Sequence, residues 1–213
     1  MGRSIQIDTF SRFTQVSRET IDSLVKYENI LIKSNEKLNL IGKSTINNIW
    51  SRHFLDSAQV IDFIDKNDVK ICTDLGSGAG LPGIVLAILM KPKKPEFKVI
   101  FYEKSYHKSN FLKEISKKFK LNTEINQKNI FEQKDLRTDI IISRAFKPLP
   151  IIFEIAERNF KNFKHIILFL GRNGKKILHE AYRIWKFDCE EKKSLTSNDS
   201  LIVKISNLQK KNG

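Results

Sequence analysis

The stretch that decides the fold is Ile71-Cys-Thr-Asp-Leu75, which runs directly into Gly76-Ser-Gly-Ala-Gly80 and then Leu81-Pro-Gly83. A short apolar run that ends in glycines is typical of a buried strand followed by a tight turn. We expect a helix to begin at Pro82, because proline suits the first turn of a helix, and to extend to Met90. Ligands of doubly wound sheets bind beyond the carboxyl ends of the strands, so this turn is the expected ligand site.

The sequence after this turn continues the alternation of strand and helix. Helices are expected over 111–119 and 151–160, and further strands over four apolar runs at 97–103, 139–143, 165–170 and 201–205. Short, continuous apolar strands separated by helices indicate a parallel sheet covered on both faces. The expected fold class is therefore α/β.

Helical spacing dominates the sequence before the first strand. Apolar residues recur at helical intervals between Ile21 and Ile32, and a second amphipathic stretch runs from about Thr45 to Asp65. We expect residues 1–66 to form a helical N-terminal extension that packs on a core domain of residues 67–213.

The composition is strongly basic. The 213 residues include 38 Lys and Arg against 24 Asp and Glu, a formal net charge of +14, which favours a polyanionic partner. A lysine-rich composition from an AT-biased genome is the alternative explanation of this excess. The two cysteines, Cys72 and Cys189, are too few for a disulfide framework or a zinc site, and no apolar run reaches the ~18 residues of a membrane span. We expect a soluble, cytoplasmic monomer without a metal.

Three interpretations of the glycine turn compete. The segment from Gly78 to Gly83 satisfies the dinucleotide pattern G-x-G-x-x-G. A pyrophosphate, however, needs amide donors at the helix start, where Pro82 has none and Asp74 adds negative charge. S-adenosylmethionine carries a sulfonium and an ammonium group and no phosphate, so Asp74 can attract it. The sequence favours S-adenosylmethionine over a dinucleotide and over a turn without a ligand.

Glu103 supports the same interpretation. It stands at the end of the second expected strand, where a carboxylate can accept hydrogen bonds from both ribose hydroxyls of an adenosine. The alternative is an ordinary solvated carboxylate.

Four segments, in order along the chain, resemble the RsmG (GidB) methyltransferase family, and the resemblance spans Asn35 to Phe169. They are Asn39-Leu-Ile41, His53-Phe-Leu-Asp-Ser57, Asp74-Leu-Gly-Ser-Gly-Ala-Gly-Leu-Pro-Gly83 and Ser143-Arg-Ala145. The resemblance implies a class I S-adenosylmethionine-dependent methyltransferase, with a Rossmann-like, mainly parallel seven-stranded sheet and helices on both faces. It also implies methylation of N7 of a guanine in the 530 loop of 16S ribosomal RNA.

The resemblance implies a set of site residues as well. Arg144 would lie beside the cofactor and the target, and His53 would be a structural or RNA-positioning residue. Because guanine N7 has a lone pair and no proton, direct in-line attack on the methyl group needs no general base. The expected cofactor-binding residues are Asp74, Gly76, Ser77, Gly78, Gly80, Leu81, Glu103, Ile130, Phe131 and Arg144.

Clustered lysines suggest how RNA would be held. Residues 91–120 contain ten lysines against three acids, and such clusters suit phosphate contacts. The expected RNA-binding residues are Lys104, Lys108, Arg172 and Lys175, with 16S ribosomal RNA or the small ribosomal subunit as the partner. The chain departs from the family pattern at Leu170-Gly-Arg-Asn-Gly174 and at Asp199-Ser200. A non-catalytic RNA- or ribosome-binding protein on the same fold is the alternative, and the lysines disfavour a small-molecule methyltransferase.

Overall fold

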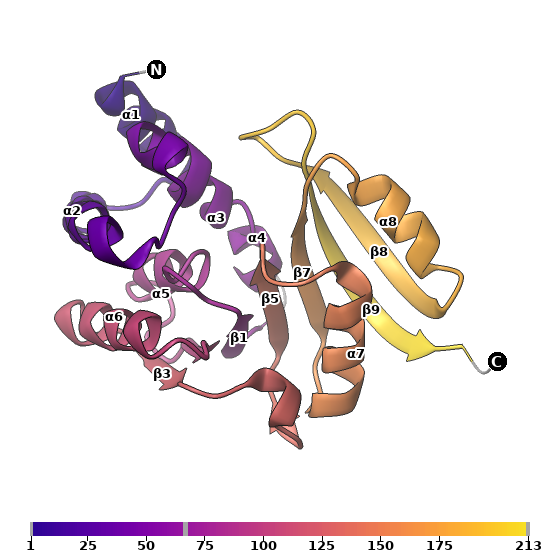
Figure 1. The fold of residues 1–213 in the computed structure, drawn as a ribbon. Helices are drawn as coiled ribbons and strands as arrows, with labels where there is room; N and C mark the ends of the chain where they lie inside the picture. Colours follow the sequence, from indigo (N-terminus) through magenta and orange to yellow (C-terminus); the bar gives the residue numbers. More distant parts are fainter. Residues whose placement is uncertain (1, 66–67, 212–213) are drawn as a thin grey trace.

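The fold is built on a seven-stranded sheet, seen in a computed structural model that describes residues 2–65 and 68–211 (Figure 1). The strand order is β3 (Thr123–Asn126), β2 (Lys98–Tyr102), β1 (Ile71–Leu75), β5 (Ile140–Arg144), β7 (His165–Leu170), β9 (Leu201–Lys210) and β8 (Trp185–Lys193). The first five strands are parallel, and β9 is antiparallel to both of its neighbours. The expectation of a mainly parallel seven-stranded sheet is confirmed. A second, small sheet pairs β4 (Leu136–Arg137) with β6 (Phe160–Asn162).

Helices precede and connect these strands. Those before β1 are α1 (Arg3–Thr14), α2 (Arg18–Leu38), the 3₁₀ helix η1 (Lys43–Asn48), the π helix η2 (Trp50–Leu55), α3 (Asp56–Ala58) and α4 (Ile61–Asp65). Those within the sheet region are α5 (Gly83–Met90), α6 (Tyr106–Lys118), the 3₁₀ helix η3 (Ile130–Glu132), α7 (Leu149–Asn159) and α8 (Gly174–Ala181). The single helix expected from about Thr45 to Asp65 is instead a succession of short helices, η1, η2, α3 and α4.

The sheet separates two hydrophobic clusters, one on each face. In β5, Ile140 and Ile142 belong to one cluster and Ile141 to the other, as the alternation of side chains along a strand requires. The first cluster includes all the large side chains of α5, a helix buried over its whole length. The second includes residues of α7 and α8.

The N-terminal helices share the first cluster with the sheet. An aromatic row formed by Phe10, Trp50, Phe54 and Tyr27 has ring centroids 5.1–5.4 Å apart and joins α1, η2 and α2. These side chains are almost wholly buried, and they pack in the same cluster as α5. The expected domain boundary between residues 66 and 67 lies outside the described residues.

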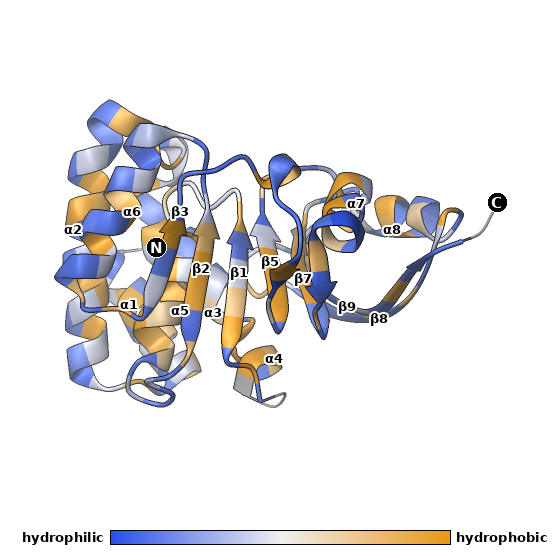
Figure 2. Ribbon diagram, turned by 90° about the horizontal axis from the view of Figure 1, so that it is seen from below, coloured by the Kyte–Doolittle hydropathy of each residue, from blue (hydrophilic) through white to orange (hydrophobic). Residues whose placement is uncertain are grey.

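Strand β8 and helix α8 were not predicted from the sequence. Strand β8 is the outer strand next to β9, and most of its residues are polar (Figure 2). Only one side of an edge strand needs to be apolar, so β8 lacks the continuous hydrophobic run that marks the central strands. Among residues 2–65 and 68–211, no helix is long and apolar enough to cross a membrane.

Candidate active site

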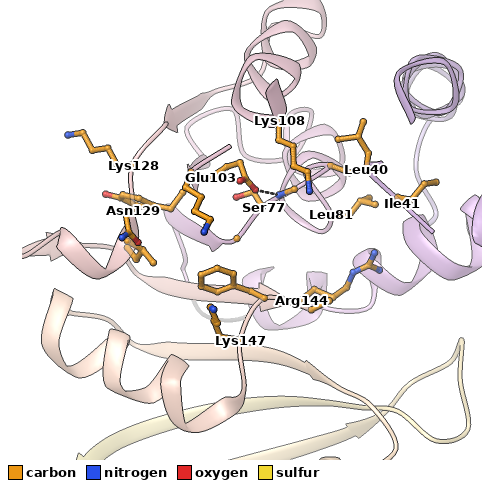
Figure 3. A pocket seen from close by; sticks show the side chains of 18 of the residues that line it. Leu40, Ile41, Ser77, Leu81, Glu103, Lys108, Lys128, Asn129, Arg144 and Lys147 are labelled. Carbon is orange, nitrogen blue, oxygen red and sulfur yellow. Dashed lines mark hydrogen bonds between the residues drawn. The ribbon is translucent and has the colours of Figure 1, made fainter. Parts of the chain in front are cut away.

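A cavity of about 610 Å³ lies where the strand order reverses. From β1 the chain adds β2 and β3 on one side and then crosses to β5 on the other, so the ends of β1 and β5 leave a gap between their following loops. This is the place where doubly wound sheets bind ligands. Figure 3 shows residues of both halves around the cavity, with Glu103 on one side and Arg144 on the other.

The glycine turn forms one wall of this cavity. Gly76 and Gly80 have φ angles of +70° and +85°, a region that residues with a Cβ rarely adopt. A Cβ on Gly76 would also lie 2.1 Å from the ring of Phe146, which packs against the turn. Of the residues predicted to bind a cofactor, Gly76, Ser77, Gly78 and Leu81 line the cavity and Gly80 does not.

Asp74 fixes the turn from behind. Its side chain is buried and does not line the cavity, and its Oδ2 accepts a hydrogen bond of 3.0 Å from the Gly83 backbone N–H. Burial raises the pKa of Asp74 to about 7. Because the first backbone N–H of α5 already donates to this carboxylate, it is not available to a pyrophosphate. Direct contact of Asp74 with a cofactor stays a prediction.

Glu103 ties the end of β2 to the glycine turn. Its Oε2 accepts from the Gly78 N–H at 2.9 Å and its Oε1 from the Ser105 N–H at 2.8 Å. The side chain is nearly buried and lines the cavity (Figure 3). Each carboxylate oxygen keeps a further lone pair, so Glu103 can still accept hydrogen bonds from a bound ligand.

The helices before β1 build another wall. The Tyr27 hydroxyl donates to the Ala79 carbonyl at 2.6 Å, and Asn35 Oδ1 accepts from the Ile41 N–H at 2.8 Å. These bonds place Leu40, Ile41 and Gly42 beside the glycine turn, where they line the cavity. In the sequence, Asn39-Leu-Ile41 was one of the segments that resemble the family, but it was not predicted to be part of the site.

Arg144 is the centre of a hydrogen-bonded chain. It donates to Asp56 Oδ2 at 3.0 Å and to His53 Nδ1 at 2.7 Å. Since a guanidinium only donates, His53 Nδ1 must accept, and the Nε2–H is left to donate to Thr45 Oγ1 at 2.8 Å. The Thr45 hydroxyl in turn donates to the Gly42 carbonyl at 2.7 Å. The segments around His53 and Arg144 thus form one structural unit.

His53 is neutral in this arrangement. Burial lowers its pKa to about 3, with further contributions from the positive charges of Arg144 and Arg52. Both ring nitrogens already have partners, so the imidazole has no free lone pair with which to take a proton from a substrate. His53 is therefore held in place between Arg144 and Thr45 as a neutral imidazole.

Four lysines line the cavity, at Lys104, Lys108, Lys128 and Lys147. None of them forms an ion pair within the described part of the chain. Lys147 Nζ lies 6.0 Å from the ring centroids of both Phe131 and Phe146. Figure 3 shows Lys108 and Lys147 on opposite sides of the cavity, which therefore combines the carboxylate of Glu103 with several unpaired cations.

The remaining predicted residues divide into two groups. Ile130 and Phe131, predicted to bind the cofactor, line the cavity beside Asn129. Arg172 and Lys175 do not line it, and Arg172 instead forms an exposed ion pair with Asp199 at 3.2 Å. Lys128, Asn129, Phe146 and Lys147 were missed because they stand in loops whose only sequence signal is that they follow a strand.

Comparison with known proteins places the chain in a family. Residues 20–203 match the family described as rRNA small subunit methyltransferase G, GidB. A ribosomal RNA small subunit methyltransferase G of Pelagibacter ubique (strain HTCC1062) is 48% identical over 199 residues, which cover 92% of this chain and 93% of that protein. The protein of the same name from Rickettsia felis is 35% identical over 92% of this chain and 98% of its own length.

Solved structures show the same fold at low sequence identity. The 16S rRNA methylase RmtB has a TM-score of 0.55 at 12% identity, covering 90% of this chain and 75% of that one. TrmK of M. capricolum, solved with S-adenosyl-homocysteine, has a TM-score of 0.53 at 15% identity, covering 70% and 66%. The fold is that of the class I methyltransferases, and the chain belongs to the rRNA small subunit methyltransferase G (GidB) family.

Proposed function

We propose that this protein transfers the methyl group of S-adenosylmethionine to N7 of a guanine in the 530 loop of 16S ribosomal RNA, guanine 527 in the numbering of that RNA. The observation that carries the proposal is the cavity at the strand reversal, where a glycine turn faces Glu103 and where Asp74 occupies the amide that a phosphate would need. Family membership supplies the class of reaction and of substrate.

The residues present fit the cofactor. A cavity of about 610 Å³ is in the range of small-molecule sites, ~300–1,000 Å³. Glu103 would accept hydrogen bonds from the ribose, and the backbone of Gly76 and Gly78 would approach the methionine portion closely. Ile130 and Phe131 would contact the adenine. The Asp74 carboxylate, behind the turn, would add a favourable field for a cationic ligand.

The cofactor supplies an electrophilic methyl group attached to a sulfonium. Guanine N7 would take up this methyl group directly, with the electron pair of the carbon–sulfur bond left on sulfur, so the residues of the site would have to align the two molecules and would not have to move a proton. No proton is transferred, which agrees with a His53 whose ring nitrogens are both engaged. Arg144, fixed by His53 and Asp56, would position the base, and alignment and exclusion of water would provide the rate enhancement.

The lysines around the cavity would hold RNA phosphates. S-adenosylmethionine carries a net positive charge and a single carboxylate, which does not account for the gathering of four lysines, Lys104, Lys108, Lys128 and Lys147, around the cavity. Phosphate contacts give affinity without reading sequence. Arg172, paired with Asp199, and Lys175 on α8 remain predicted RNA contacts at a distance from the cavity.

Methylation of small ribosomal subunits from cells that lack this protein tests the proposal. With tritiated cofactor, the wild-type protein should add one methyl group to the 16S RNA, recovered as 7-methylguanine in the 530 loop. Arg144→Ala should reduce kcat/KM by about 100-fold or more, because misplacing the base by 1 Å has that effect. Failure of the wild type on both subunits and naked RNA, or full activity of Arg144→Ala, would contradict the proposal.

Calorimetry separates this proposal from the non-catalytic alternative. An RNA-binding protein that only keeps the fold should bind 16S RNA without affinity for S-adenosylmethionine. Heat of binding for the cofactor in the absence of RNA, lost in Glu103→Ala, would argue against that alternative.

A further inference from the structure

A second hollow, of about 390 Å³, lies beside the first. It opens at the carboxyl ends of β5 and β7, at the same edge of the sheet as the first cavity. The two hollows share His53, Arg144 and Ala145 in their walls. We call this second hollow the β7 cleft. Arg144 therefore lies between two neighbouring hollows, and the first of them is the proposed cofactor site.

The lining of the β7 cleft is divided into an apolar floor and a polar rim. The floor is formed by the half-buried Phe169, Leu170 and Leu201. The rim carries hydroxyl groups, among them Ser197 and Ser200, which form a hydrogen bond of 3.1 Å with each other. That bond uses the hydrogen of Ser200, so both oxygens retain lone pairs that can accept.

The loop between β8 and β9 forms one side of this cleft and is held by the N-terminal helices. Asp56 Oδ1 accepts from the Thr196 hydroxyl at 2.7 Å, while the other oxygen of Asp56 binds Arg144. Gln59 Oε1 accepts from the Leu195 N–H at 2.6 Å, and Arg52 donates to the Thr196 carbonyl at 3.3 Å. Figure 1 shows this loop, in orange-yellow, reaching toward the purple N-terminal helices. The same residues that fix Arg144 thus also fix the wall of the cleft.

We propose that the β7 cleft is the subsite for the acceptor nucleotide, with the base on the Phe169, Leu170 and Leu201 floor and N7 directed past Arg144 into the proposed cofactor cavity. This inference rests on the proposed function and extends it by naming where the guanine binds. Chemistry on a base requires that the base leave its stack, and an unstacked base is held by apolar contact and by hydrogen bonds to its edges.

The chemistry of guanine explains why the rim carries hydroxyls. The commonest specific contact to guanine, a bidentate arginine on O6 and N7, would block the atom that must be methylated. Recognition is left to the N1–H and the 2-amino group, which are donors and need acceptors. Ser197 and Ser200 supply uncharged acceptors, and the exposed Arg52 at the mouth suits the phosphate of the same nucleotide.

Gly171 provides a direct test. It lines the β7 cleft, a Cβ added there meets no atom within 4 Å, and its φ is not in the left-handed region. Substitution with Ala, Leu and Trp should therefore fill the cleft in steps while the protein remains folded. The loss of activity should grow with the size of the side chain, and Gly171→Trp should lower kcat/KM for ribosomal subunits by about 100-fold or more. The Kd of S-adenosylmethionine, measured by calorimetry without RNA, should stay within about twofold of wild type, as expected for independent sites.

Asn173→Trp is the matched control. Asn173 is exposed two residues further along, it does not line the cleft, and its side chain makes no capping hydrogen bond to α8. This variant should methylate as the wild type does. Equal kcat/KM for Gly171→Trp and Asn173→Trp, or a loss of cofactor affinity in Gly171→Trp, would overturn the proposal. A wild-type protein that binds the cofactor but methylates no ribosomal RNA would instead refute the proposed function.

Discussion

Arg144, at the end of β5, donates a hydrogen bond to His53 Nδ1 across 2.7 Å, although 91 residues separate the two in sequence. The bond fixes the tautomer of the imidazole and joins the N-terminal helices to the centre of the sheet. Arg144 and His53 both line the proposed cofactor cavity and the β7 cleft, so this bond bears on the predictions for catalysis that follow.

The dependence of the methylation rate on pH should contain no contribution from protonation of His53 near neutral pH. Its pKa, lowered to about 3, leaves the ring neutral throughout the range in which the protein is assayed. We expect kcat measured from pH 5.5 to pH 8 to lack a limb near pH 6.5, and His53→Gln to keep the same profile. A limb at that pH that disappears in His53→Gln would show that the imidazole does take up a proton during the reaction.

Asp74 should make the protein less stable as the pH rises from about 4 to about 7. Its pKa is raised from 3.8 to about 7, so in this window the folded protein holds a proton that the unfolded chain has released. The stabilisation is present in full below the unfolded pKa and is lost as the pH passes the folded one. The neutral His53 acts in the opposite direction, since protonation of the unfolded chain below pH ~6.5 favours unfolding.

Asp74→Asn separates these two effects. Without the Asp74 contribution, the free energy of unfolding in urea should rise more steeply with pH than in the wild type, between pH 4.5 and pH 7. The exposed Asp8, on α1, provides Asp8→Asn as the comparison, which should follow the wild type. Parallel curves for wild type and Asp74→Asn would mean that the buried carboxyl is ionised across the whole window.

Gly76→Ala should destabilise the protein by about 1–3 kcal/mol and weaken cofactor binding. The residue has a φ of +70°, and the new Cβ would lie 2.1 Å from the ring of Phe146. In the double variant with Phe146→Ala, the loss of stability caused by the clash with the ring should be relieved. The loss caused by the positive φ of residue 76 should remain. Gly171→Ala, where the Cβ meets open space, is the control, and urea unfolding gives the comparison.

Tyr27→Phe should reduce stability by about 1–3 kcal/mol, because it leaves the buried Ala79 carbonyl without its donor. Since Ala79 belongs to the glycine turn, calorimetry should also show weaker binding of the cofactor. Tyr182 is half-exposed at the other end of the sheet, so Tyr182→Phe should change neither quantity. Equal cofactor affinity in Tyr27→Phe and wild type would show that α2 does not order the turn.

Lys108→Ala and Lys147→Ala should each weaken RNA binding and reduce its dependence on salt. Removing one lysine–phosphate interaction should lower the slope of log K against log salt by ~1. Filter binding of 16S RNA at several salt concentrations measures this slope. Lys26→Ala removes an exposed lysine of α2 that does not line the cavity and should keep the wild-type slope. An unchanged slope in both cavity variants would place the RNA elsewhere.

The order of strand, turn and helix could be predicted from local patterns. The apolar run that ends at Leu75, the glycines after it and the recurrence of short strands each carry their own signal, and all of them are found in the structure. Glu103 was predicted for the same reason, since the end of a parallel strand is a position that the sequence itself marks. Strand β8 was missed because its charged residues hide the pattern of an edge strand.

The sequence by itself determined the fold class, the glycine turn after the first strand and the basic net charge, because these depend on composition or on neighbours along the chain. Only the tertiary structure decided that Asp74 turns inward to Gly83, that His53 is buried beside Arg144 and stays neutral, and that a second cleft opens beside the first. These features depend on which strands lie side by side and on how the N-terminal helices pack against them. Such contacts join residues far apart in sequence, so the local pattern of apolar and polar residues does not predict them.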